Sequence, residues 1–202
     1  QESPEQLQLR MIDFLITSGR AVMYPIYRGT YERRREDLPN PWQSADMIRS
    51  RAFVDSTTFW MSDLTRSVDY LVTRNEIRVD RLAYYGFSWG ASMGPLALAL
   101  EPRLAVGVLL DGGIDPIQPR SEVRQQHFAA RVKSPVLMLN GVHDAYFSLE
   151  ASQRPLFECL GTQPEHKEHA LFPCSHVVFA HHRNQAIGEI LDWLDAYLGP
   201  VN

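Results

Sequence analysis

The chain alternates short, continuous apolar runs with longer segments whose apolar residues recur at helical spacing, and this alternation limits the fold more than any other feature. The runs "RLAYYGFS", "RLAVGVLLDGG" and "SPVLMLNG" are typical of strands that are covered on both faces. Around them lie the helical segments "TTFWMSDLTRSVDYLVTRN", "WGASMGPLALALEP" and "NQAIGEILDWLDAYLGP". This order predicts an α/β protein, a three-layer αβα sandwich with a mostly parallel sheet.

A helix and a strand are expected before these segments, and a further strand is expected toward the C-terminus. The stretch "SPEQLQLRMIDFLITSG" predicts a helix with Ser3 as its N-cap, Pro4 at its first position and Gly19 as its stop. The next run, "RAVMYPIY", predicts a short buried strand that Pro25 brings to an end. "HALFP" is a shorter strand candidate. Without repeats or low-complexity segments, residues 1–202 predict a single domain.

Composition excludes several classes of protein. With 45% hydrophobic and 22% charged residues the chain has a globular composition, and its net charge of -4 argues against a nucleic-acid partner. No apolar run approaches the roughly 18 residues that cross a membrane. The two cysteines, Cys159 and Cys174, favour free thiols over a disulfide, so we expect a cytoplasmic protein. We expect no metal and no organic cofactor.

The stretch "YYGFSWGASMG" contains a possible nucleophile between a strand and a helix. Gly86-Phe87-Ser88-Trp89-Gly90 has the G-x-S-x-G form, in which small flanking residues let the strand and helix approach a strained serine. Ser88 is therefore the candidate nucleophile. The Trp89 N–H, at the start of the helix, is the candidate oxyanion donor. A serine in an incidental turn is the alternative.

A serine nucleophile needs a base, and the base needs a carboxylate to orient it. Asp144 follows the run "VLMLNG", and His176 lies in the next loop, "FPCSHVVF", so nucleophile, acid and base follow in the order Ser88, Asp144, His176. Asp111 in "LLDGG" is the rival acid, although a turn residue bonded to the following glycines is the simpler interpretation. The competing histidines are His127, His143, His166, His169, His181 and His182.

Other side chains are candidates for contact with a substrate. Tyr27 and Phe147 are predicted to line an acyl or leaving-group pocket, with core packing as the alternative. A group of arginines can meet an anionic substrate, but interleaved glutamates favour a solvated loop face. These arginines are Arg28, Arg33, Arg34 and Arg35.

Several strings resemble one family of proteins. They are "GRAVMYPIYRGTYERR", "DLTRSVDYLVTRNEI", "LAYYGFSWGASMGPLALALEPRL", "PVLMLNGVHD", "RPLFECLGT" and "LDWLDAYLGP". From about Phe14 to Val201 the chain resembles the α/β-hydrolase superfamily, within it the prolyl-oligopeptidase and dienelactone-hydrolase-like branch. More narrowly, it is similar to bacterial hydrolase-like domains that are often attached to protein-kinase chains. The resemblance implies the α/β-hydrolase fold and a Ser-His-Asp triad.

The sequence departs from the family pattern at two points. Cys174 and Ser175 precede His176 where a glycine is common. In the superfamily, a strand ending in a His-Gly or Pro-Gly loop precedes the segment "LITSGRAVMYPIYRGT" and supplies the second oxyanion N–H. The resemblance therefore implies the C-terminal portion of a longer protein, lacking the N-terminal strands. We expect an upstream segment or a partner chain to complete the sheet between the strands at Ala21 and Arg81.

These residues predict a serine hydrolase, most simply a carboxylesterase that cleaves small acyl esters through an acyl-enzyme. The expected partner is a small-molecule ester, with neither nucleic acid nor membrane involved. A peptidase or thioesterase would use the same triad. An alternative from another class is a hydrolase-fold regulatory or interaction module with weak or no catalysis.

Overall fold

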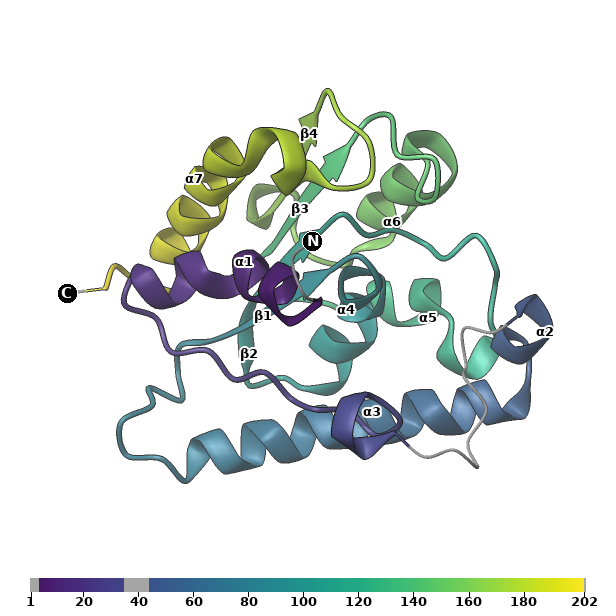
Figure 1. The fold of residues 1–202 in the computed structure, drawn as a ribbon, viewed down its shortest axis with the longest axis horizontal. Coiled ribbons are helices and arrows are strands. Elements are labelled where there is room, and N and C mark those ends of the chain that lie inside the picture. The colour runs from purple at the N-terminus through teal and green to yellow at the C-terminus, as the bar shows by residue number, and fades with distance from the viewer. Residues whose placement is uncertain (1–3, 35–43, 202) are drawn as a thin grey trace.

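The computed structural model describes residues 4–34 and 44–201, which form one four-stranded parallel sheet with helices on both faces (Figure 1). The strands lie in the order β1-β2-β3-β4, which is also their order along the chain. Their bounds are β1 (Leu82–Phe87), β2 (Leu104–Leu110), β3 (Val136–Gly141) and β4 (Lys167–Phe172). The runs predicted as strands form β1, β2 and β3, and "HALFP" overlaps β4, so these predictions are confirmed.

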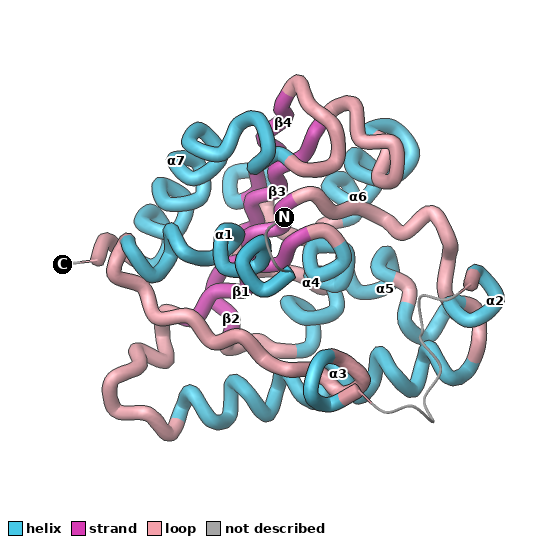
Figure 2. The backbone as a smooth tube through the Cα atoms, viewed as in Figure 1, coloured by secondary structure: helices cyan, strands magenta, loops and turns pink. Residues whose placement is uncertain are grey.

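The order of the strands decides which helices cover which face (Figure 2). Right-handed crossovers that all step in one direction place their helices on one face of the sheet. That face carries α4 (Trp89–Leu100), α5 (Gln125–Ala129) and α6 (Arg154–Cys159), together with α3 (Arg51–Val72). The other face carries α1 (Pro4–Thr17) and α7 (Val178–Leu198). The predicted three-layer sandwich is therefore confirmed.

Alternate residues of the central strands fill two cores. Val108 and Leu110 of β2 face α1 and α7, whereas Leu109 between them faces α4. All three side chains are 0% exposed, as expected for strands that are covered on both faces. Shorter elements complete the described fold: α2 (Ala45–Ile48), a π-helical turn (Leu149–Gln153) and 3-10 turns at Tyr31–Arg33, Ser121–Val123 and Pro164–His166.

Helix α3 begins earlier than the sequence pattern predicts. Its N-cap is Ser50, whose Oγ accepts the N–H of Phe53 at 3.2 Å. Phe53 and Val54 are both buried, so the apolar face extends toward the N-terminus of the helix beyond the predicted start at Thr57. Helix α1 begins at Pro4 as predicted, while its expected cap, Ser3, lies outside the described residues.

The strand predicted at residues 20–27 does not form, and this prediction is wrong. A strand needs a neighbour for its backbone N–H and C=O groups, and within the described residues this segment pairs with no strand. Other contacts hold it instead: Arg20 forms an ion pair with Asp195, and the Arg33 guanidinium donates to the carbonyl of Ile26 at 2.8 Å. The expected strand at Ala21 is therefore not paired with β1.

Two other expectations concern the state of the cysteines and membrane-spanning helices. Cys159 and Cys174 are free thiols, as predicted, the first exposed and the second buried. Among the helices of residues 4–34 and 44–201, none combines the length and the apolar character that a membrane span requires.

The contact between β1 and α4 yields a stability prediction. A Cβ added at Gly86 would lie 2.5 Å from backbone atoms of Gly90, so strand and helix would have to move apart. We expect Gly86→Ala to lower the free energy of unfolding by about 1–3 kcal/mol in urea denaturation. In the matched control Gly188→Ala, within α7, the new Cβ meets nothing within 4 Å. This control should raise stability by about 0.5–1 kcal/mol. Equal stability of Gly86→Ala and the original protein would contradict the close approach.

Candidate active site

Ser88 occupies the turn between β1 and α4 in a strained backbone conformation. Its φ is 51° and its ψ is -109°, which non-glycine residues rarely adopt. The Ser88 N–H donates to the carbonyl of Leu110 at 2.8 Å, and the Ser88 carbonyl accepts the N–H of Ser92 at 2.9 Å. The first bond fixes Ser88 to the end of β2, and the second begins α4. The side chain is thereby raised above the carboxyl edge of the sheet.

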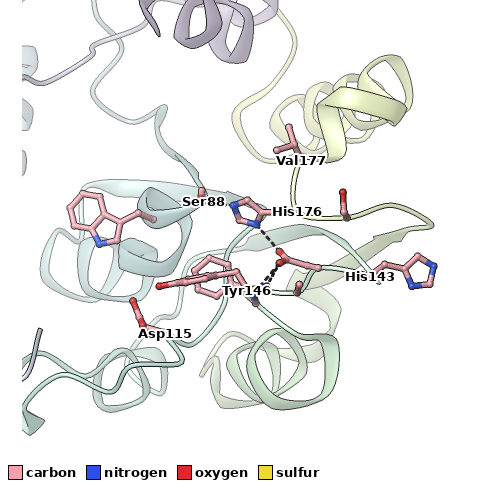
Figure 3. Close-up of a pocket in the computed structure, with 11 residues that line it drawn as sticks. Ser88, Asp115, His143, Tyr146, His176 and Val177 are labelled. Carbon is pink, nitrogen blue, oxygen red and sulfur yellow. Dashed lines mark hydrogen bonds and ion pairs between the residues drawn. The ribbon is translucent and has the colours of Figure 1, made fainter. Parts of the chain in front are cut away.

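Ser88, His176 and Asp144 form a chain of two side-chain hydrogen bonds, and the labelled Ser88 and His176 lie next to each other in Figure 3. Ser88 Oγ lies 2.8 Å from His176 Nε2, and His176 Nδ1 lies 2.7 Å from Asp144 Oδ2. A carboxylate only accepts hydrogen bonds, so it fixes the proton on Nδ1 and leaves Nε2 to accept from the serine hydroxyl. The structure thus brings together the three residues that the sequence singled out.

Asp144 is held by the backbone of its own loop. Its side chain is 0% exposed, and Oδ1 accepts the N–H groups of Tyr146 at 2.8 Å and Phe147 at 3.0 Å. The loops that follow β3 and β4 are joined because the His143 N–H donates to the carbonyl of Cys174 at 2.9 Å. Acid and base are therefore fixed relative to each other by backbone bonds.

Aromatic rings enclose the His176 imidazole. The centroids of Phe147, Phe87 and Tyr146 lie 5.8 Å, 6.2 Å and 6.5 Å from that of His176. Its side chain is 32% exposed. The ring therefore keeps one orientation while its Nε2 edge stays within reach of the pocket.

Asp111, the rival acid, has a different role. It is 0% exposed with φ at 56°, and its Oδ2 accepts the N–H of Val178 at the start of α7 at 3.0 Å rather than bonding the following glycines. Its Oδ1 is buried without a hydrogen-bond partner among the described residues. Burial raises the pKa of Asp111 to about 8, against the opposing effect of the Val178 N–H. Asp111 thus supports the helix that follows His176.

Within the described residues, none of the competing histidines hydrogen-bonds to Ser88 or Asp144. His169 Nε2 lies 3.1 Å from Asn140 Oδ1, and burial lowers the pKa of His169 to about 4. His182 packs against Phe172 with 5.5 Å between ring centroids. His143 is exposed and lines the same pocket as His176 (Figure 3).

A pocket of about 510 Å³ opens above Ser88. Most of its accessible surface is apolar, and Phe147, which the sequence predicts as a pocket residue, lines it together with Trp89. The Trp89 ring packs edge-on against Trp60, with 4.8 Å between centroids. The described lining residues are Ser88, Trp89, Asp115, His143, Asp144, Ala145, Tyr146, Phe147, Ser175, His176 and Val177.

Other predicted contact residues do not reach this pocket. Tyr27 packs in the core between α3 and α4, where burial raises its pKa to about 12. Arg33 forms an ion pair with Asp63 at 2.9 Å, and the guanidinium carbon of Arg28 lies 3.9 Å from the centre of the Phe59 ring. Arg34 is exposed and is not among the lining residues, and Arg35 lies outside the described residues.

Asp115 and Tyr146 are among the polar lining residues that sequence reasoning missed. Each carried a local signal, because Asp115 follows the end of β2 in "DGGIDP" and Tyr146 lies beside the predicted Phe147. Across the part of the chain that the structure describes, no group of three or more His, Cys, Asp or Glu side chains is arranged to hold a metal ion.

Comparisons with known proteins show which fold this is. The sequence matches no family model and no curated protein. A cold-adapted esterase from an Arctic intertidal metagenomic library is 24% identical with a TM-score of 0.61, and the match covers 73% of this chain and 63% of the esterase. The chain therefore spans less than two thirds of that protein's length.

Two other solved structures are similar at lower identity. The esterase Pf2001 of Pyrococcus furiosus is 15% identical with a TM-score of 0.72, and the match covers 94% of this chain and 76% of that one. The 2,6-dihydroxy-pseudo-oxynicotine hydrolase is 20% identical with a TM-score of 0.56, over 69% of this chain and 46% of that one. At these identities the likeness concerns the fold.

The buried carboxyl of Asp111 yields a prediction about stability and pH. Its pKa is about 8 in the folded protein, whereas an aspartate in an unfolded chain has a pKa of about 3.9. Between about pH 4 and the folded pKa, the folded state holds a proton that the unfolded chain has released, so the free energy of unfolding falls as pH rises. Asn cannot ionise. Asp111→Asn should therefore gain stability relative to the original protein across this window.

Urea denaturation at several pH values across this window measures the effect. The control is Asp80→Asn, which removes a carboxylate whose side chain is 69% exposed and should show no such trend. Parallel pH profiles for Asp111→Asn and the original protein would contradict the prediction.

Proposed function

The chain has the α/β-hydrolase fold, and from this premise we propose that it is a serine hydrolase, a carboxylesterase that cleaves small acyl esters through an acyl-enzyme. One observation carries the proposal: the hydrogen-bonded chain Ser88–His176–Asp144 ends in a strained serine at the floor of a pocket. Isolated serine hydroxyls are weak nucleophiles, and a histidine held by a buried carboxylate is the arrangement that activates them.

The geometry supports a two-step reaction. In the first step His176 Nε2 takes the proton of Ser88 Oγ as this oxygen attacks the ester carbonyl carbon, and the imidazolium then protonates the leaving alcohol. In the second step the same nitrogen activates water, which releases the acid and restores Ser88. Asp144 keeps the imidazole oriented and stabilises its charged form, because its own position is fixed by the N–H groups of Tyr146 and Phe147.

The negative charge that forms on the carbonyl oxygen needs hydrogen-bond donors. Trp89 is the first residue of α4, and the first-turn N–H groups of a helix point out of its positive end. We therefore assign the Trp89 N–H as one oxyanion donor. The Tyr84 hydroxyl donates to the carbonyl of Gly90 at 2.6 Å, which ties this first turn to β1.

The pocket suits a small ester. About 510 Å³ is the size of a pocket for a small molecule, and its wall is mostly apolar, as is common in ligand pockets. Peptidases and thioesterases use the same three residues, so the ester assignment rests on the pocket and on the resemblance to esterases. The two free thiols suit a reducing compartment, so we place the protein in the cytoplasm.

The second oxyanion donor is proposed to come from outside the described sheet. Strand β1 is an edge strand of that sheet, and an edge presents unpaired N–H and C=O groups that accept another strand. We propose that an upstream segment or a partner chain pairs there and brings a loop to the side of Ser88 opposite Trp89.

The triad assignment makes a direct prediction. Ser88→Ala should abolish labelling by a fluorophosphonate probe, and Ser88→Ala and His176→Ala should each lower kcat for nitrophenyl acetate by about 10⁶-fold. Asp144→Asn should cost about 10⁴-fold through the wrong histidine tautomer. The matched control is His181→Ala, an exposed histidine at the start of α7, which should keep full activity. Ser88→Ala protein that still turns over the ester would refute the assignment.

The proposed missing donor makes a separate prediction about kcat. Removing one oxyanion donor costs about 10²–10³-fold in kcat. A protein that carries the additional strand and loop should therefore exceed the 202-residue chain by about that factor, with a smaller change in KM. Single-turnover acylation of Ser88 by a nitrophenyl ester measures this step. Equal acylation rates in the two proteins would show that the described residues already supply both donors.

A further inference from the structure

Asp115 is a buried carboxylate in the pocket of Ser88 that the proposed ester chemistry does not use. It lies in the segment that follows β2, it is 5% exposed, and it lines the same pocket as Ser88, Trp89 and Tyr146 (Figure 3). Burial raises the pKa of this carboxyl, because a carboxylate away from water is destabilised. A buried carboxyl group that lines the pocket of the nucleophile is a candidate for binding part of the substrate.

The hydrogen bonds of Asp115 leave part of its carboxyl group available. Oδ1 accepts the N–H of Ile117 at 2.8 Å, and this bond closes a local turn around Pro116. Oδ2 has no hydrogen-bond partner within residues 4–34 and 44–201. A carboxylate accepts at both oxygens, so Oδ2 can accept a hydrogen bond from a ligand in the pocket that Asp115 lines.

The surroundings of Asp115 favour a positively charged donor. The Tyr146 side chain extends toward Asp115 in Figure 3. Burial raises the pKa of the Tyr146 phenol most, and the negative charge of Asp115 raises it further. Trp89, Tyr146 and Phe147 supply aromatic surface in the same pocket. Aromatic faces attract cations, and a nearby carboxylate adds a charge-assisted hydrogen bond.

The charges of the lining residues also favour a positively charged ligand. The described lining residues include no lysine and no arginine, while Asp144 is already bonded to His176. We propose that Asp115, with the aromatic wall beside it, is a specificity subsite for an ammonium group, so that the preferred substrates are small esters with a cationic amine in the acyl or the alcohol half. This inference rests on the proposed esterase function and names its substrate class. An anionic ester would meet the Asp115 carboxylate and be disfavoured.

The alternative is that Asp115 has only a structural role, holding the turn that its hydrogen bond to Ile117 closes. Asn separates the two roles, because its side-chain oxygen can still accept the Ile117 N–H while the negative charge is gone. The control for long-range electrostatics is Glu150→Gln, which removes a carboxylate with a 73% exposed side chain that does not line the pocket.

The first experiment compares kcat/KM for matched pairs of esters, with nitrophenyl as the leaving group where the acyl chain varies. The pairs are amino-terminated and methyl-terminated acyl chains of equal length, and aminoalkyl and alkyl esters of the same acid. In the original protein and in Glu150→Gln, an amine-bearing ester should be preferred. In Asp115→Asn the ratio of cationic to neutral ester should fall by about 10–100-fold, the usual worth of a hydrogen bond to a charged group.

The second experiment does not depend on turnover. Isothermal titration of Ser88→Ala protein with 4-phenylbutylamine, 4-phenylbutanol and 4-phenylbutanoate should give tightest binding to the amine. Combining Ser88→Ala with Asp115→Asn should remove that preference. Equal binding of amine and alcohol to Ser88→Ala protein would overturn the ammonium subsite, as would an unchanged ester ratio in Asp115→Asn. If the amine binds through Asp115 but Ser88 neither reacts with a fluorophosphonate nor turns over esters, the esterase proposal fails and the subsite stands.

Discussion

The backbone hydrogen bonds at the carboxyl edge of the sheet hold the rest of the site in place. Beyond the strands, the Ser88 N–H donates to Leu110, the Asp111 N–H to Leu139 and the Val142 N–H to Phe172, all at 2.8–2.9 Å. Each bond carries the parallel ladder past the end of a strand. Loops that would otherwise diverge therefore begin at the same edge, and side chains far apart in sequence reach hydrogen-bonding distance without long flexible connections.

Sequence patterns predicted the elements whose signals are local. Buried strands and small-residue turns follow from neighbouring residues, so β1, β2, β3 and the placement of Ser88, Asp144 and His176 after strands could be derived, although their catalytic roles stay a proposal. The segment at residues 20–27 has an equally apolar composition but forms no strand. A strand depends on a partner that local sequence does not reveal, so composition alone could not decide this case.

The pocket was harder to predict than its nucleophile. Phe147 and Tyr27 were both predicted to line the pocket; Phe147 lines it, whereas Tyr27 lies in the core. The difference is one of topology. Tyr27 lies on a segment outside the sheet, and its direction is set by packing against α3 and α4. Asp115 and Tyr146 sit on loops at the carboxyl edge, so the strand ends that place Ser88 also place them.

Three aspartates at this edge differ mainly in the number of hydrogen bonds that each carboxylate accepts. Asp144 accepts from two backbone N–H groups and His176, so every part of its carboxylate is used in holding the base. Asp111 has one backbone donor in a closed environment, which favours its neutral form and suits it to support α7. Asp115 also has one backbone donor, but it faces the pocket. Because only Asp115 combines an unused oxygen with access to a ligand, it is the one of the three whose missing partner a substrate can supply.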